Sequence, residues 1–100
     1  MELGSAVSET SLRAATRASL VLAHAHGLRS IAFPAIGTGV GGFPAQRCAE
    51  IMLEEARAHL AGATTLVEVH FVLHGEPTYR VFEQVNDAER VRATAARFAL

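Results

Sequence analysis

The apolar positions of the chain recur with two spacings, one typical of helices and the other typical of strands. Helical spacing extends over residues 11–25 and again over residues 44–61, and a last amphipathic stretch begins near Pro77. Two shorter segments are predicted as strands: 30–36 is apolar throughout, and in 64–73 the residues Val67, Val69, Phe71 and Leu73 share one face. The pattern therefore predicts an α/β chain with the element order α-β-α-β-α.

The first predicted helix, residues 11–25, is preceded by residues with capping chemistry. Ser8 or Thr10 can act as the N-cap, because a hydroxyl oxygen can accept a hydrogen bond from a free backbone N–H group. Gly27 suits the position after the helix end. Helical spacing places a set of mainly small and apolar residues on one stripe, which consists of Leu12, Ala15, Ser19, Leu22 and His26.

The second predicted helix, residues 44–61, has an apolar side and a polar side. Its apolar stripe consists of Ala45, Cys48, Ala49, Met52, Ala56 and Leu60. We interpret Glu50, Glu54 and Glu55 as residues of a solvated face and assign them no catalytic role. Cys48 falls on the apolar stripe, which predicts a buried structural thiol rather than a nucleophile.

The two predicted strands differ in the character of their faces. The segment 30–36 is apolar throughout, as expected for a strand that is covered on both faces. One face of the segment 64–73 is mixed, which predicts partial exposure. Pro34 cannot donate to a sheet ladder, so it belongs at a bulge, an edge or a strand end. The strand–helix–strand order predicts parallel pairing with a right-handed crossover.

A loop with four glycines in six positions, Gly37, Gly39, Gly41 and Gly42, joins the first strand to the second helix. Glycine allows positive φ, and successive N–H groups in such a turn can point inward and bind an anion. The following helix, with Pro44 at its first position, adds the positive end of its dipole. Because the loop has no cationic side chain, backbone amides would hold any phosphate; a plain glycine turn that binds nothing is the alternative.

Two nucleotide-binding motifs do not fit the spacing or the composition of the chain. Gly37-x-Gly39-x-x-Gly42 spells the dinucleotide fingerprint, but Pro44 makes the helix start too late for a Rossmann site. The next strand also ends near Leu73, too far along the chain for the acidic residue of that motif. A Walker loop needs a lysine, and the chain contains none.

The composition limits the class of protein. One hundred residues, 50% hydrophobic and 19% charged, are typical of one small globular domain. A net charge of −1 argues against nucleic acid as a partner, and no apolar run approaches the ~18 residues of a membrane span. The single cysteine excludes an intrachain disulfide and predicts a reducing, cytoplasmic location. Neither a metal nor a cofactor is predicted.

The whole stretch IAFPAIGTGVGGFP, residues 31–44, resembles the second phosphate-binding loop of macro domains, the ADP-ribose-binding family. Residues 12–20 and 49–60 resemble the helices on either side of that strand and loop, and residues 69–73 resemble the last strand of the family. The resemblance keeps the order and spacing of the family over roughly residues 8–86.

This resemblance implies a fold that is only part of a macro domain. Residues 1–100 are expected to form the C-terminal portion of a three-layer α/β/α domain, with two parallel strands. Residues 87–100 are expected to extend the last helix or to fray. The first half of the family fold, which carries the residues linked to hydrolysis, is expected to be missing. Because two parallel strands make a poor sheet, we expect a homo-oligomer or assembly with a chain that supplies the missing half.

The resemblance also implies a ligand, which is ADP-ribose or an ADP-ribosylated molecule. It assigns the diphosphate to the backbone amides of Thr38, Gly39, Val40, Gly41 and Gly42, the distal ribose to Phe43 and the adenine to His74. No catalytic residue is assigned. Two alternatives are an ADP-ribosyl or O-acetyl-ADP-ribose hydrolase completed by the missing half, and a non-enzymatic dimerising module in which the loop is a relic.

Overall fold

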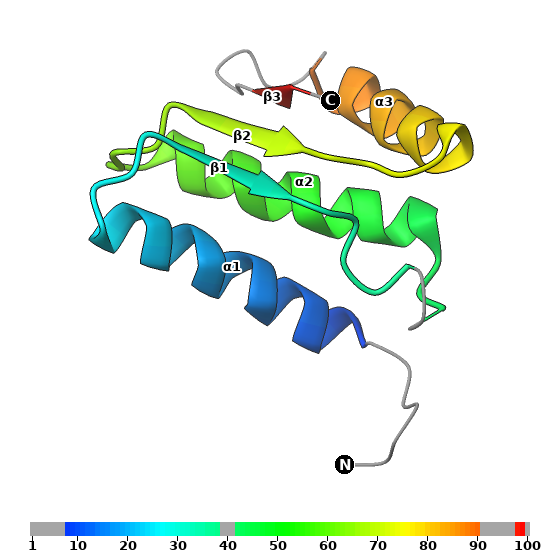
Figure 1. Ribbon diagram of the computed structural model, residues 1–100, viewed down its shortest axis with the longest axis horizontal. Helices are drawn as coiled ribbons and strands as arrows, with labels where there is room; N and C mark the ends of the chain where they lie inside the picture. Colours follow the sequence, from blue (N-terminus) through cyan, green and yellow to red (C-terminus); the bar gives the residue numbers. More distant parts are fainter. Residues whose placement is uncertain (1–7, 39–41, 91–97, 100) are drawn as a thin grey trace.

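The computed structural model describes residues 8–38, 42–90 and 98–99. Its elements are α1 (Glu9–Ala25), β1 (Ser30–Phe33), α2 (Ala45–Ala61), β2 (Glu68–Phe71), α3 (Glu76–Arg90) and β3 (Phe98–Ala99) (Figure 1). The α/β class and the predicted order of three helices and two strands are confirmed. Among the described residues, no helix is long and apolar enough to cross a membrane.

The strands form one parallel sheet in the order β1-β2-β3. β1 and β2 pair from Ser30↔Glu68 to Phe33↔Phe71, which confirms the predicted parallel pairing. The short strand β3, which the sequence pattern did not predict, adds to the other side of β2. Within the segment 87–100, residues up to Arg90 therefore extend α3, and Phe98–Ala99 join the sheet.

Both main strands are shorter than predicted. β1 ends at Phe33, directly before Pro34, so the proline lies at the strand end. Upstream of β2, the N–H of Thr65 donates to Nδ1 of His24 at 3.1 Å, and the N–H of Leu66 donates to a threonine side chain. Both amides donate to side chains and not to β1, and the ladder begins at Glu68.

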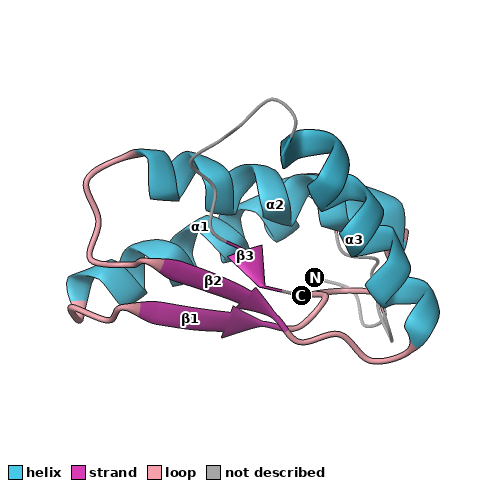
Figure 2. Cartoon of the chain, turned by 90° about the horizontal axis from the view of Figure 1, so that it is seen from above, coloured by secondary structure: helices cyan, strands magenta, loops and turns pink. Residues whose placement is uncertain are grey.

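The helices gather on one side of the strands, and α2 lies directly behind the sheet (Figures 1 and 2). On the covered face, Phe33, Val69 and Phe71 are buried. On the opposite face, Ala32 and Val72 are exposed. The prediction that β1 is covered on both faces is therefore wrong for the described residues, because no described helix packs on that side. The described elements therefore form two layers, the sheet and the helices that cover one of its faces.

Three aromatic rings connect the two main strands with α3. The ring centroid of Phe71 lies 6.0 Å from that of Phe33 and 5.4 Å from that of Phe82. Phe82 of α3 is fully buried. Stacked and tilted aromatic pairs at this separation add to the stabilisation from burial alone, so Phe82 holds the middle of α3 beside the end of β2.

Helix α1 begins with a capping box at Ser8, one of the two predicted N-caps. The Ser11 N–H donates to the Ser8 hydroxyl at 3.0 Å, and the Ser8 N–H donates to the Ser11 hydroxyl at 3.1 Å. The buried stripe of this helix consists of Leu12, Thr16, Leu20 and Ala23. Leu22, on the predicted stripe, is 60% exposed. The helix is rotated relative to the prediction, because its packing against α2 selects the buried side.

Two arginines of α1 converge on Glu55 of α2. Nε and Nη2 of Arg17 donate to its two carboxylate oxygens at 3.0 and 3.1 Å, and Arg13 donates to Oε2 at 2.7 Å. Arg13 also binds the neighbouring Glu54. Glu55 is only 6% exposed, so its assignment to a solvated face is wrong. α1 covers this side of α2 and supplies the cations that a buried carboxylate needs.

A second ion-pair cluster ties the first turns of α1 and α2 together. Nε and Nη2 of Arg47 donate to the carboxylate of Glu9 at 2.7 and 2.8 Å, and Nη1 donates to Glu50 at 3.0 Å. The hydrogen bond from Arg47 lowers the pKa of Glu9, and hydrogen bonds from Gln46 and then Arg47 lower the pKa of Glu50. Both carboxylates are therefore ionised in the folded chain at neutral pH.

We expect the stability of the chain to decrease as the pH falls below about 4.5. Hydrogen bonds lower the pKa of Glu9, Glu50 and, through Arg17, Glu55 from the ordinary value of 4.5. As the pH falls, the unfolded chain therefore binds protons before the folded chain does, and the free energy of unfolding decreases until the folded carboxylates are protonated. Urea unfolding between pH 7 and pH 3 measures how the free energy of unfolding depends on pH. In the variant Glu55→Gln this dependence should be weaker, because one of the three carboxylates is gone. An unchanged dependence would show that Glu55 does not contribute to it.

Candidate functional site

The glycine-rich loop lies at the carboxyl edge of the parallel strands, between the end of β1 and the start of α2 (Figure 1). β2 runs parallel to β1 and ends at the same edge. His74 and Gly75 follow it and lead into α3. The structure thus brings the loop and His74 to one edge, which is where ligands bind in open α/β sheets.

The two ends of the loop are closed on one another. Gly37 and Gly42 have φ values of +80° and +68°, a region that favours glycine. The N–H of Phe43 donates to the carbonyl oxygen of Gly37 at 2.8 Å, across the base of the loop. Residues 39–41, which include the predicted diphosphate contacts Gly39, Val40 and Gly41, lie outside the described residues.

Thr38 is held by the turn that precedes it. Its hydroxyl donates to the carbonyl oxygen of Ala35 at 3.0 Å. Its N–H lies 3.5 Å from the same oxygen, at the outer limit of a hydrogen bond. The side chain therefore anchors the loop, whereas the amide makes only a weak internal contact.

The first turn of α2 begins directly after the loop, and Pro44 is its N-cap rather than its first residue. Pro44 provides no side-chain cap, although its carbonyl oxygen accepts the first helical hydrogen bond, from Cys48 at 2.9 Å. No acidic residue lies in this turn. Among the described residues, the N-cap therefore offers the N–H groups of this turn no side-chain acceptor, and no carboxylate of the same turn offsets the positive end of the helix dipole.

Sequence reasoning missed the contact between Arg47 and Glu9 at this edge. Arg47 lies in the first turn of α2, where the helix dipole disfavours a cation. Glu9, in the first turn of α1, offsets this unfavourable interaction by a bidentate ion pair with Arg47. The signal available in the sequence was the unusual position of the arginine, which called for a carboxylate from another element.

Phe43 and Cys48 lie on the core side of the loop. Phe43 is buried and belongs to the hydrophobic core cluster. The thiol of Cys48 is fully buried and donates to the carbonyl oxygen of Ile36 at 3.4 Å. Burial raises the pKa of Cys48 to about 11. The predicted buried structural thiol is confirmed.

We expect Cys48 to resist thiol reagents while the chain is folded. The thiol is buried and its pKa is raised to about 11, so little reactive thiolate is present at pH 8. Reaction with Ellman's reagent should be at least ~100-fold slower in native buffer than in guanidinium chloride, because it requires opening of the chain. Equal rates in the two buffers would contradict this burial.

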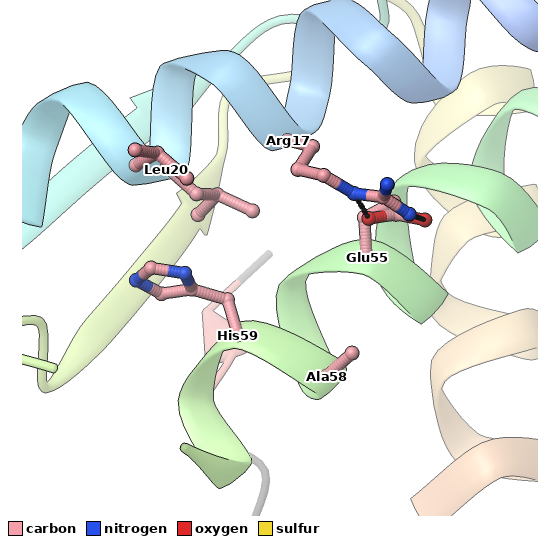
Figure 3. A pocket seen from close by; sticks show the side chains of 6 residues that line it. Arg17, Leu20, Glu55, Ala58 and His59 are labelled. Atoms are coloured by element: carbon pink, nitrogen blue, oxygen red, sulfur yellow. Dashed lines mark hydrogen bonds and ion pairs between the residues drawn. The ribbon is translucent and has the colours of Figure 1, made fainter. Parts of the chain in front are cut away.

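A hollow of about 320 Å³ lies elsewhere, between α1 and α2 (Figure 3). It is lined by Arg17, Leu20, Val21, Glu55, Ala58 and His59. Arg17 and Glu55 bind each other across it. Nε2 of His59 lies 2.7 Å from a threonine hydroxyl, and burial lowers the pKa of His59. Its three ionisable side chains thus each have a partner within the chain, and none of the residues predicted to bind ADP-ribose lines it.

Comparison with known proteins identifies the family. The family model described as Macro domain matches residues 1–52, a segment that contains α1, β1 and the glycine-rich loop. In structure, the chain is similar to an Oceanobacillus iheyensis macrodomain with ADP, with a TM-score of 0.75 and 29% identity. That match covers 84% of this chain and 44% of the other. A mutant of that macrodomain with ADPR matches with a TM-score of 0.71, 31% identity and coverage of 80% of this chain and 42% of the other.

Relatives by sequence include an uncharacterized protein of Mycobacterium tuberculosis, which is 44% identical over 82 residues. An O-acetyl-ADP-ribose deacetylase of Klebsiella pneumoniae is 39% identical over 82 residues. Both matches cover 82% of this chain, but the chain spans only 22% of the mycobacterial relative and 47% of the Klebsiella relative. With a family match over residues 1–52 and neighbours of the same fold, the chain belongs to the macro domain family.

Proposed function

We propose that this chain binds ADP-ribose, or an ADP-ribosylated molecule, at the carboxyl edge of its sheet. The observation that carries the proposal is the position of the glycine-rich loop, between the end of β1 and the uncapped first turn of α2, in a macro domain family member. The similar macrodomain structures contain ADP or ADPR, and several relatives are named O-acetyl-ADP-ribose deacetylase. The molecules named in these descriptions have an ADP group in common.

In this proposal, the diphosphate is bound by the backbone amides of Thr38, Gly39, Val40, Gly41 and Gly42. Residues 37–44 contain no arginine, lysine or histidine, so main-chain N–H groups are the donors that the loop offers. The positive φ angles at Gly37 and Gly42 support a turn in which successive amides point to one side. The first turn of α2 adds further N–H groups and a favourable dipole.

The remaining parts of the ligand are assigned to Phe43 and His74. Phe43 lies mostly within the core, so only its edge would border the distal ribose. His74 is exposed and lies three residues after the end of β2, which ends at the same edge of the sheet as β1. An imidazole ring in this place could stack on adenine with one face.

Calorimetric titration with ADP-ribose tests the proposal. We expect saturable binding with one site per chain, and no binding of adenosine, which lacks the diphosphate that the amides recognise. A dissociation constant tighter than 1 mM corresponds to more than about 4 kcal/mol of binding free energy. Absence of heat at millimolar ADP-ribose would contradict binding by this chain and would favour the loop as a relic.

Hydrolysis of an ADP-ribosyl ester is a second candidate function, favoured by the name O-acetyl-ADP-ribose deacetylase among the relatives. Ester hydrolysis needs a general base near the distal ribose, and residues 37–44 contain no aspartate, glutamate or histidine. We therefore propose that the chain alone binds but does not hydrolyse. Acetate release from O-acetyl-ADP-ribose, compared with the Klebsiella relative, tests this; turnover by the chain alone would assign catalysis to residues within it.

Two kinds of assembly would cover the exposed face of the sheet. One is a homo-oligomer, and the other is a complex with a chain that supplies the rest of the fold.

We also propose a cytoplasmic location, because a lone, buried thiol fits a reducing compartment. Size measurement in solution and cell fractionation test these two proposals separately.

A further inference from the structure

The connection between α2 and β2 is bound to the end of α1 and to the residues that follow it. The hydroxyl of Thr65 donates to the carbonyl oxygen of Leu28 at 2.7 Å, and the N–H of Val67 donates to that of Arg29, also at 2.7 Å. The N–H of Thr65 donates to Nδ1 of His24, in the last turn of α1, at 3.1 Å. These hydrogen bonds hold the connection where it leads into β2.

The contact between Thr65 and His24 depends on the protonation of the imidazole. A backbone N–H group can only donate, so the contact assigns Nδ1 of His24 as the acceptor and places the proton of the neutral ring on Nε2. A protonated imidazole carries a hydrogen on both ring nitrogens and cannot accept. If His24 gains a proton, a donor therefore faces the donor of Thr65, and this hydrogen bond is lost.

A second imidazole, that of His59 on α2, adjoins the first. The ring centroids of His24 and His59 lie 6.3 Å apart, edge to face. Nε2 of His59 lies 2.7 Å from the hydroxyl of Thr64, which also accepts from the N–H of Leu66 at 3.2 Å. A hydroxyl can donate to a neutral ring or accept from a protonated one, so this contact persists in both charge states of His59. Of the two imidazoles, only His24 binds the connection through a contact that protonation removes.

The charged groups around the two rings bind one another rather than the imidazoles. Glu55 lines the same hollow as His59 but binds Arg17 across it (Figure 3). On β2, Glu68 lies 3.7 Å from His70. The adjoining segments of α2 and of the connections carry only groups that are or can become positive, which are His26, Arg29 and Arg57. The described contacts of the two rings therefore include no carboxylate that would compensate a positive charge.

We propose that the contact between His24 and Thr65 is a pH-sensitive latch, which releases the connection before β2 as the pH falls below about 6.5. His59 acts in the same direction. Burial, and then the neighbouring His24, lowers the pKa of His59 from 6.5, so an opened chain binds protons first and the closed chain loses stability as the pH falls through about 6.5. The latch lies at the amino end of β2, opposite the glycine-rich loop, and the proposal does not rest on ADP-ribose binding.

Hydrogen exchange of individual amides, measured by NMR on the full chain between pH 7.5 and pH 5.5, tests the latch. After correction for the intrinsic pH dependence of exchange, protection of the Thr65 amide should fall by at least ~5-fold, which corresponds to the loss of one ordinary hydrogen bond. The amide of Met52, which is fully buried within α2, should keep its protection and serves as the internal reference. Constant protection of Thr65 over this range would overturn the proposal.

Two histidine variants locate the sensor. In His24→Asn, the side-chain oxygen can replace Nδ1 as an acceptor but does not titrate, so the protection of Thr65 should become independent of pH. His26→Asn is the matched control, because it removes an exposed imidazole two residues away that has no described contact with Thr65. This variant should keep the pH dependence of the parent. The same pH dependence in His24→Asn as in the parent, or its loss in His26→Asn, would refute the assignment to His24.

Discussion

Replacement of Gly41 by glutamate should abolish ADP-ribose binding. In the proposed site, the diphosphate is bound by main-chain N–H groups of residues 38–42, which have no cationic side chain to assist them. A carboxylate introduced among these amides would compete for them and repel the phosphates. We expect affinity to fall by at least ~100-fold, or about 3 kcal/mol, in calorimetric titration.

Gly62→Glu is the matched control for this variant. Gly62 caps the far end of α2, has a φ of −96°, and would place a new Cβ no closer than 3.7 Å to another atom outside its own residue and chain neighbours. It adds the same charge away from the loop and without backbone strain. Binding should be unchanged in this variant. If Gly41→Glu binds as well as Gly62→Glu, the loop does not hold the diphosphate.

Replacement of Glu55 by alanine should destabilise the folded chain more than the same replacement of its neighbour Glu54. Glu55 is 6% exposed and accepts hydrogen bonds from both Arg13 and Arg17, which join α1 to α2. Its removal leaves a cavity and two guanidinium groups without their main partner. Losing charged hydrogen bonds at a buried site should reduce the free energy of unfolding by about 2–3 kcal/mol, as measured by urea unfolding at pH 7.

Glu54→Ala provides the comparison for Glu55→Ala. Glu54 precedes Glu55 on α2 and also binds Arg13, but its side chain is 64% exposed. Exposed ion pairs contribute little, so this variant should lose less than about 1 kcal/mol. Equal losses in the two variants would show that burial of Glu55 does not set the strength of the contact.

The elements of the fold followed from local patterns. Helical spacing and the capping hydroxyl of Ser8 predicted α1, and the proline after the glycine loop marked the start of α2. Parallel pairing followed from the strand–helix–strand order, because such a connection needs a crossover. These features depend on neighbouring residues and can be recognised without knowledge of distant contacts.

Features set by contacts between elements were not predicted. The buried side of α1 is chosen by its packing on α2, so Leu22 is exposed where spacing alone placed it on a common stripe with Leu12. Glu55 borders the apolar side of α2 and became buried only because α1 brings two arginines to it. β3 has two residues, too few for a periodic signal.

The candidate site was predictable in its position and not in its contacts. Strand polarity places the glycine-rich loop and His74 at one edge of the sheet, as the sequence indicated. The closure between Phe43 and Gly37 and the ion pair between Arg47 and Glu9 depend on three-dimensional arrangement. Their residue types alone did not reveal these partners.

Amide chemical shifts test the central claim most directly. In a ¹⁵N-labelled chain titrated with ADP-ribose, the amide signals of residues 38–42 and of the first turn of α2 should shift the most, and adenosine should leave them in place. Signals near the hollow between α1 and α2, such as Ala58 and His59, should not move. Shifts centred on that hollow, or no shifts at millimolar ADP-ribose, would contradict a diphosphate site in the glycine-rich loop.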